Sequence, residues 1–168
     1  MNMIEARIER REDGLAAVFG DTVLALDQET VSRRPALAAY DGREIILGIR
    51  PEDLDDAALA TERTGPRIRG RVDLREALGS EVLVHFTVAA KQAVTDEMRE
   101  LAEDVGDDRV LDQLASGAQP EAAPLVGRFS PFTRVIEGDL VEVSVQRRAL
   151  HFFDLRTGLA ISRDVAAQ

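Results

Sequence analysis

The sequence predicts a mainly β fold built from small barrels of short strands. Three observations indicate this class: apolar and polar residues alternate in many short stretches, glycine-containing turn signals separate those stretches, and only one block has helical periodicity. With 45% hydrophobic and 31% charged residues among 168, the chain has the composition of a folded protein with one domain or two small lobes. We therefore expect short strands joined by tight turns.

The first third of the chain contains four expected strands. Ile4, Ala6 and Ile8 alternate with charged residues, which is the pattern of a half-buried strand. Glycine follows or precedes aspartate between the stretches, and glycine accepts the positive φ that hairpin turns need. The strands are expected at residues 4–8, 15–19, 22–26 and 44–49, with a polar connector or short helix at 33–40 and turns at 13–14, 20–21 and 41–42.

A break is expected at residues 51–66, where prolines, Gly65 and acidic residues favour an exposed connection that begins with a helical turn. Beyond it, residues 68–78 and 82–88 predict a hairpin around Gly79-Ser80. One face of its second strand is uniformly apolar, formed by Val82, Val84, Phe86 and Val88.

The periodicity changes between residues 94 and 124. Thr95 can cap a helix, and its apolar face would carry Met98, Leu101 and Val105. A second short helix at 110–114 and a loop at 115–124 would follow. We interpret residues 94–124 as a helical and loop insertion within one domain that covers residues 1–168. The remaining strands are expected at 125–129, 140–145 and 150–154, before a turn at Thr157-Gly158.

The overall charge and composition exclude several functional classes. A net charge of -10 and an aromatic content of 4% argue against nucleic acid as a partner, because phosphates need clustered cations and bases need stacking platforms. The lack of cysteine excludes disulfides and thiolate metal sites. Apolar runs fall short of the ~20 residues that cross a membrane, and the N-terminus is not a signal peptide. We therefore expect a soluble, cytoplasmic protein.

Four segments, in order, carry a more specific signal. Residues 48–54 read GIRPEDL, and this motif resembles the one that marks the C-terminal regulatory region of maltose-type sugar ABC transporter ATP-binding subunits. The opening MNMIEA resembles the junction after the ATP-binding domain of that family. Residues 76–81 resemble the turn of its central hairpin, and residues 138–143 with 150–158 resemble its closing strands. The longer block at 94–124 is similar to insertions of actinobacterial members.

This resemblance implies both a fold and a function. The fold would be a pair of oligonucleotide-binding-like (OB-type) barrels made of interleaved strands, known in the family as a TOBE domain. The chain would be a detached regulatory and dimerisation domain, or a natural stand-alone protein, serving an ABC importer for carbohydrates or related solutes. Its partners would be a second copy of itself, its own ATPase domain, indirectly the membrane subunits, and a regulatory protein. It would lie at the inner face of the cell membrane.

The motif residues are the candidate positions for structural or partner contacts. For Arg50 two interpretations stay open: pairing with a carboxylate, Glu52 or Asp154, or contact with a partner protein. The full set is Gly48, Ile49, Arg50, Pro51, Glu52, Leu54, Gly79, Gly138, Asp139, His151, Asp154 and Gly158.

Catalytic, cofactor-binding and metal residues are not expected in this chain. The phosphate loop of an ATPase needs a lysine after a glycine-rich stretch, and Lys91, the only lysine, has no glycine nearby. Residues 23–28 and 116–119 imitate two further ATPase motifs, but in the wrong order and incompletely. ATP and Mg²⁺ would therefore belong to the ATPase domain. His85 and His151 lack metal-ligand spacing, with His85 expected on the solvent side and His151 in a structural role. The acidic pairs at 55–56 and 107–108 are expected to cap and solubilise.

Two other functions remain as alternatives. One is a small-anion module, of the kind that binds molybdate or tungstate between subunits of oxyanion importers. Backbone donors and a few arginines could form such a site despite the acidic balance. The other, less favoured, is nucleic-acid binding by the barrel surface.

Overall fold

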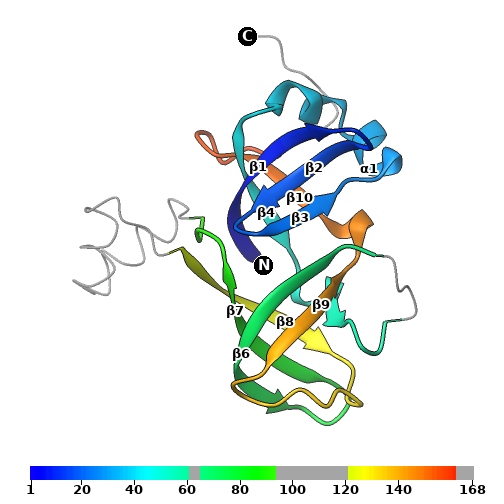
Figure 1. The fold of residues 1–168 in the computed structure, drawn as a ribbon, viewed down its shortest axis with the longest axis vertical. Helices are drawn as coiled ribbons and strands as arrows, with labels where there is room; N and C mark the ends of the chain where they lie inside the picture. Colours follow the sequence, from blue (N-terminus) through cyan, green and yellow to red (C-terminus); the bar gives the residue numbers. More distant parts are fainter. Residues whose placement is uncertain (61–64, 94–120, 162–168) are drawn as a thin grey trace, which may run out of the picture.

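The computed structural model describes residues 1–60, 65–93 and 121–161, and within them ten strands form two five-stranded antiparallel sheets (Figure 1). The first sheet has the order β10-β4-β1-β2-β3. Its strands are β1 (Asn2–Arg11), β2 (Gly14–Phe19), β3 (Thr22–Ala25), β4 (Glu44–Ile49) and β10 (His151–Asp154). The last strand thus comes from the far end of the chain and pairs with β4.

The second sheet has the order β5-β9-β6-β7-β8. Its strands are β5 (Leu54–Asp56), β6 (Arg67–Ala77), β7 (Val82–Ala89), β8 (Ala122–Phe129) and β9 (Leu140–Val145). We call residues 1–49 and 151–161 the first lobe and the described residues of 54–145 the second lobe. Both sheets curl, and the lobes lie one above the other in Figure 1. This architecture confirms the predicted mainly β class.

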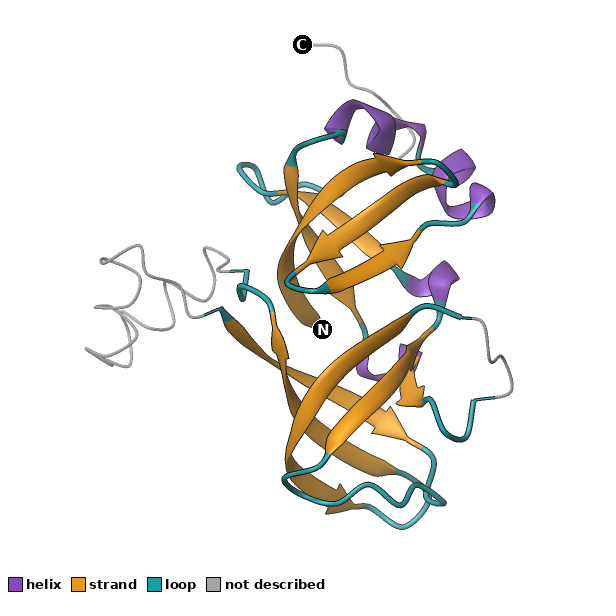
Figure 2. Cartoon of the chain, in the orientation of Figure 1, coloured by secondary structure: helices purple, strands orange, loops and turns teal. Residues whose placement is uncertain are grey.

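Helical segments are short and gather on the first lobe and at the passage between the lobes (Figure 2). The α-helix α1 (Gln28–Arg33) begins after Asp27, whose Oδ1 accepts a hydrogen bond from the Thr30 N–H at 2.7 Å. This helix was not among the predicted elements, although its capping residue is visible in the sequence. Three 3₁₀ helices complete the described elements: η1 (Pro35–Tyr40), η2 (Pro51–Asp53) and η3 (Arg147–Ala149).

The core follows the alternation of the strands. In β1 the buried side chains are Ile4, Ala6 and Ile8, and in β7 they are the predicted Val82, Val84, Phe86 and Val88. Buried side chains of both lobes form one continuous hydrophobic cluster. Burying a side chain of this size contributes about 1.5–3 kcal/mol, so the shared core holds the two sheets together.

Two expected boundaries were wrong. A three-residue strand, β5, lies inside the connection expected at 51–66, because Leu54 and Asp56 face inward and pair with β9. Strand β8 begins at Ala122 rather than 125, because residues 122–124 still pair with 87–89 of β7. The helices expected between 94 and 120 lie outside the described residues. Among the described helices, none has the length and apolar character needed to span a membrane.

Candidate functional site at the junction of the two lobes

The chain passes between the lobes twice, and the two passages lie side by side. The outward passage runs from β4 through Arg50 and η2 into β5, and the return runs from β9 through η3 into β10. The Gln146 N–H donates to the Asp53 carbonyl at 3.0 Å, and Leu54 pairs with Val145. We call these two passages the crossing. The motif at residues 48–54 forms its outward passage.

The motif residues at the crossing fall into buried and exposed positions. Ile49 and Leu54 are fully buried, whereas Glu52 and Arg50 are exposed. Pro51 is the first residue of η2, where the missing N–H costs nothing. Gly48 lies close against the neighbouring strand: a Cβ there would come within 3.3 Å of the His151 Cβ and 3.1 Å of the Phe153 ring. The motif therefore combines core anchors with an exposed turn.

Arg50 does not make the predicted ion pair. Within the described part of the chain it lies within 4.0 Å of no carboxylate, so pairing with Glu52 or Asp154 is wrong. Asp154 instead accepts hydrogen bonds from the Tyr40 hydroxyl at 2.9 Å and from the Thr157 N–H and hydroxyl. Partial burial alone would raise the pKa of Asp154. The hydrogen bonds from Thr157, Tyr40 and the Arg156 N–H outweigh it and hold that pKa below its usual value.

His151 lies opposite Gly48 in the β10–β4 pair, at the end of the return passage. Its Nε2 is buried and has no hydrogen-bond partner among the described residues. Burial lowers the pKa of the imidazole, and the positive charges of Arg50 and Arg34 lower it further, against the opposing charge of Asp53. Burial in turn raises the pKa of the Asp53 carboxyl, helped by Glu52. Several ionisable groups therefore interact at the crossing.

The other candidate residues lie elsewhere. Gly79 occupies the turn between β6 and β7, and the Gly138 N–H donates to the Val72 carbonyl at 2.8 Å in the turn before β9. Asp139 belongs to that same turn, whereas the Gly158 N–H donates to the Asp154 carbonyl at 2.9 Å. The structure thus brings residues 48–54 and His151 together, places Asp154 and Gly158 at the other end of β10, and places Gly79, Gly138 and Asp139 on the second lobe.

The acidic pair Asp55-Asp56 has a role that sequence reasoning missed. Asp56 is 6% exposed, and its carboxylate accepts from the Thr133 hydroxyl at 2.6 Å and from the Ala58 N–H at 2.9 Å. Asp55 accepts from the Ser130 N–H at 3.0 Å. The pair therefore ties β5 to the turn after β8 rather than solubilising the surface. The signal in the sequence was the two-residue spacing of Leu54 and Asp56, which puts both on one face.

The lobes also meet along a second contact, which we call the seam. The Asn2 side-chain amide donates to the Val126 carbonyl at 2.9 Å and accepts from the Val126 N–H at 2.8 Å. The Glu5 N–H donates to the Lys91 carbonyl, and the Ala93 N–H to the Met3 carbonyl. The segment after β7 therefore pairs with the first residues of β1, on the side of that strand where β2 does not reach.

Gly20 makes the closest approach of the seam. It has a φ of +47°, and a Cβ there would lie 1.9 Å from the Ala89 carbonyl oxygen. Both the backbone conformation and the lack of space require glycine at this position.

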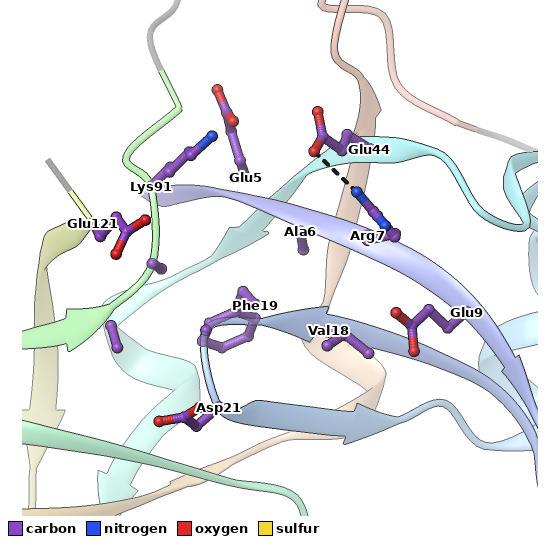
Figure 3. Close-up of a pocket in the computed structure, with 13 residues that line it drawn as sticks. Glu5, Ala6, Arg7, Glu9, Val18, Phe19, Asp21, Glu44, Lys91 and Glu121 are labelled. Atoms are coloured by element: carbon purple, nitrogen blue, oxygen red, sulfur yellow. Dashed lines mark ion pairs between the residues drawn. The ribbon is translucent and has the colours of Figure 1, made fainter. Parts of the chain in front are cut away.

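Beside the seam lies a hollow of about 440 Å³, shown in Figure 3. Arg7 and Lys91 are its cations, and Arg7 is 3.5 Å from the Glu44 carboxylate. Its acidic residues are Glu5, Glu9, Asp21, Glu44 and Glu121. This lining disfavours an anion. Among the described residues no three His, Cys, Asp or Glu side chains are arranged to hold a metal ion. The two histidines lie in different lobes, and the Nε2 of the half-buried His85 is 2.7 Å from the Glu76 carboxylate.

Comparison of the sequence with known domain families identifies the domains to which the two lobes are similar. The model of the MalK OB fold domain matches residues 1–54, and that of the TOBE domain matches residues 47–112. The chain therefore carries a MalK OB fold domain followed by a TOBE domain. The two matches overlap at residues 47–54, which is the outward passage of the crossing. The match to the first domain family therefore ends, and the match to the second begins, where the chain passes from the first lobe to the second.

Relatives of this MalK-type domain are ATP-binding proteins of importers. The trehalose/maltose import ATP-binding protein of Thermococcus litoralis is 32% identical over 96% of this chain and 34% of its own length. The trehalose import ATP-binding protein of Mycobacterium tuberculosis is 29% identical over 94% of this chain and 37% of its own. The sn-glycerol-3-phosphate import ATP-binding protein of Chromobacterium violaceum is 30% identical, covering 100% and 34%. The chain thus spans about a third of the length of these relatives.

Proposed function

We propose that this chain is the regulatory and dimerisation domain of the ATP-binding subunit of an ABC importer for carbohydrates or related solutes. The observation that carries the proposal is the match of both domain models, in order and meeting at the crossing, together with relatives named as ATP-binding proteins of such importers. Because the chain spans about a third of those relatives, ATP hydrolysis would belong to the remaining part of the subunit.

The partners and location follow from the same proposal. ATP and Mg²⁺ would bind in the ATPase domain, to which this domain would be attached, and the membrane subunits would be contacted indirectly. A regulatory protein would be a further partner, and the exposed Arg50 and Glu52 at the crossing are accessible for such a contact. The domain would act on the cytoplasmic side of the cell membrane.

A second copy of the chain is the partner for which the surface offers most support. Large apolar side chains are exposed on β6, on the turn after it, on the segment between β8 and β9 and at the start of β9. They are Leu74, Leu78, Phe132, Ile136 and Leu140, of which Phe132 and Leu140 are about four-fifths exposed at 80% and 79%. A stable dimer buries about 800 Å² on each partner, and apolar residues of this kind are the usual centre of such a contact.

Light scattering across a concentration series tests the dimer. We expect the mass of the chain to rise from monomer to dimer with concentration, and the double variant Phe132→Ser with Leu140→Ser to weaken dimerisation at least tenfold. Leu159→Ser is the matched control, since Leu159 is 70% exposed but lies on the first lobe. A chain that stays monomeric at the highest concentration, or a control that weakens association equally, would contradict the proposed dimer.

A further inference from the structure

A second hollow, of about 490 Å³, lies on the first lobe and has the opposite charge to the hollow in Figure 3. We call it the arginine hollow. Its lining residues, within the part of the chain that the structure describes, are Arg33, Arg34, His151, Phe152, Phe153, Ala160 and Ile161. None of these described residues is acidic, although the whole chain has a net charge of -10. A cationic lining in an acidic protein indicates a local preference for negative charge.

Arg34 is the fixed cation of this hollow. It follows α1 as its C-terminal cap, and its guanidinium carbon lies 5.4 Å from the centroid of the Phe152 ring. Among the described residues it has no ion-pair partner, because the nearby carboxylate of Glu29 pairs with Arg33 and, at 2.9 Å, with Arg148. Burial lowers the pKa of Arg34, and the charge of Arg33 adds to the effect. The guanidinium is thus held in place by stacking, and its charge has no ion-pair partner in the described ranges.

His151 also lines this hollow. Its Nε2 is shielded from solvent and unpartnered within the described ranges. The charged groups that act on it are Arg50, Arg34 and Asp53, and Asp53 does not line the hollow. A buried polar atom without a partner costs about 1–3 kcal/mol, and an acceptor at this position would remove that cost.

We propose that the arginine hollow binds a phosphate group, either inorganic phosphate or a phosphate monoester. The planar guanidinium of Arg34 matches two phosphate oxygens, and the protonated Nε2 of His151 would donate to a third. Phe152 and Phe153 would line the space for the organic part of a monoester. This proposal does not depend on dimerisation or on the importer, because all of these groups belong to one copy of the chain.

Nuclear magnetic resonance of the two imidazoles tests the proposal on the full chain. His85 and His151 are the two histidines of the chain, and His85 lies on the second lobe, so it serves as an internal control. Inorganic phosphate, glycerol phosphate and glucose 6-phosphate would be added separately at constant ionic strength, with sodium chloride as the reference. We expect saturable shifts of the His151 signals only, with a rise in the pKa of His151. No His151 response, or equal responses of both histidines, would overturn the proposal.

The arms of the titration separate the two sources of phosphate. Tighter binding of a monoester than of inorganic phosphate would assign the site to an organic phosphate in contact with the phenylalanine wall. Tighter binding of inorganic phosphate would assign it to the free ion. Molybdate and tungstate are further arms, and strong binding of these without any response to phosphate would contradict the proposal in favour of an oxyanion module.

Two substitutions locate the site. Arg34→Gln is expected to weaken phosphate binding at least tenfold, and Arg34→Lys should lose part of it because the charge remains but the planar fork does not. Arg148→Gln is the matched control: it removes the same charge near Glu29, yet Arg148 does not line the hollow. The His85 signals and the melting temperature report folding of each variant. Equal binding by Arg34→Gln and Arg148→Gln would place the anion elsewhere.

Discussion

The two contacts between the lobes, the crossing and the seam, are built on different principles. The crossing is covalent, because two backbone passages run side by side and its ends are anchored by the buried Ile49 and Leu54. The seam is non-covalent and consists of a few backbone and amide hydrogen bonds with one close approach at Gly20. The crossing therefore keeps the lobes connected, whereas the seam adds to the shared hydrophobic core in fixing how they pack. Substitutions on each side can test this distinction.

The largest effect is expected at Gly20 in the seam. Gly20→Ala forces an alanine into the left-handed region and its Cβ against the Ala89 carbonyl, so we expect a loss of more than about 3 kcal/mol in unfolding free energy. Gly42→Ala is the control, because Gly42 also has a positive φ but a Cβ there would meet nothing within 4 Å beyond its chain neighbours. It should cost about 1–2 kcal/mol in urea unfolding. Equal losses would mean that the lobes can move apart at the seam without cost.

The next largest effect is expected at the hydrogen bond between Thr133 and Asp56, which lies in β5 directly after the outward passage of the crossing. Thr133→Val removes the hydroxyl that donates to the buried Asp56 and should cost about 1–3 kcal/mol. Thr87→Val is its counterpart, because Thr87 makes a similar bond of 2.7 Å to Asp73 on the exposed face of β7. We expect Thr87→Val to change the unfolding free energy by no more than about 0.5 kcal/mol, with both variants measured by thermal unfolding. If both variants lose the same stability, the burial of Asp56 does not make its hydrogen bond with Thr133 more stabilising than an exposed one.

A smaller effect is expected for the seam amide. Asn2→Ala removes both hydrogen bonds with Val126 and should cost about 1–2 kcal/mol. Asn2→Asp keeps the acceptor but loses the donor, so it should fall between wild type and Asn2→Ala. Hydrogen exchange at the Val126 amide is the direct readout, and it should speed up in Asn2→Ala. Unchanged exchange would show that the seam is held without this residue.

The smallest effect is a pH dependence at the crossing. The pKa of His151 is lowered in the folded chain, so below pH ~6.5 the unfolded chain takes up a proton that the folded chain does not. Stability should therefore fall as the pH drops from about 6.5 to the folded pKa, and His151→Gln should flatten that part of the profile. His85→Gln is the control for loss of an imidazole. A profile that flattens only in the control would contradict the proton linkage of His151.

The sequence predicted the regular parts of this fold and missed the contacts that depend on three dimensions. Alternation in β1 and β7 identified the correct buried faces, and the motif at residues 48–54 marked the crossing. The seam could not be predicted, because Gly20 reads as an ordinary turn glycine and nothing local indicates that Ala89 lies against it. One of the two interpretations of Arg50, pairing with a carboxylate, was wrong for a related reason: Asp154 accepts a hydrogen bond from Tyr40, which is more than a hundred positions away.

The arginine hollow shows the same limit. Arg33 and Arg34 are adjacent in the sequence, yet only the fold shows that one is paired with Glu29 and the other stacks on Phe152. Likewise, His151 was expected in a structural role, and only the fold shows that it lies opposite Gly48 with an Nε2 that has no partner in the part of the chain described by the structure. The polarity of a side chain can be read in the sequence, whereas the balance of charges around it cannot.

Strand β10 has a consequence for the order of folding. It pairs with β4, with His151 opposite Gly48, so the first sheet gains its last strand only after the whole second lobe has been synthesised. During translation the strands of the second lobe can pair with one another. One edge of β4 stays unpaired until β10, more than a hundred residues downstream, has been made. A nascent chain that stalls before residue 151 would leave the backbone N–H and C=O groups along that edge of β4 unpaired, and such an edge can pair with a strand of another copy.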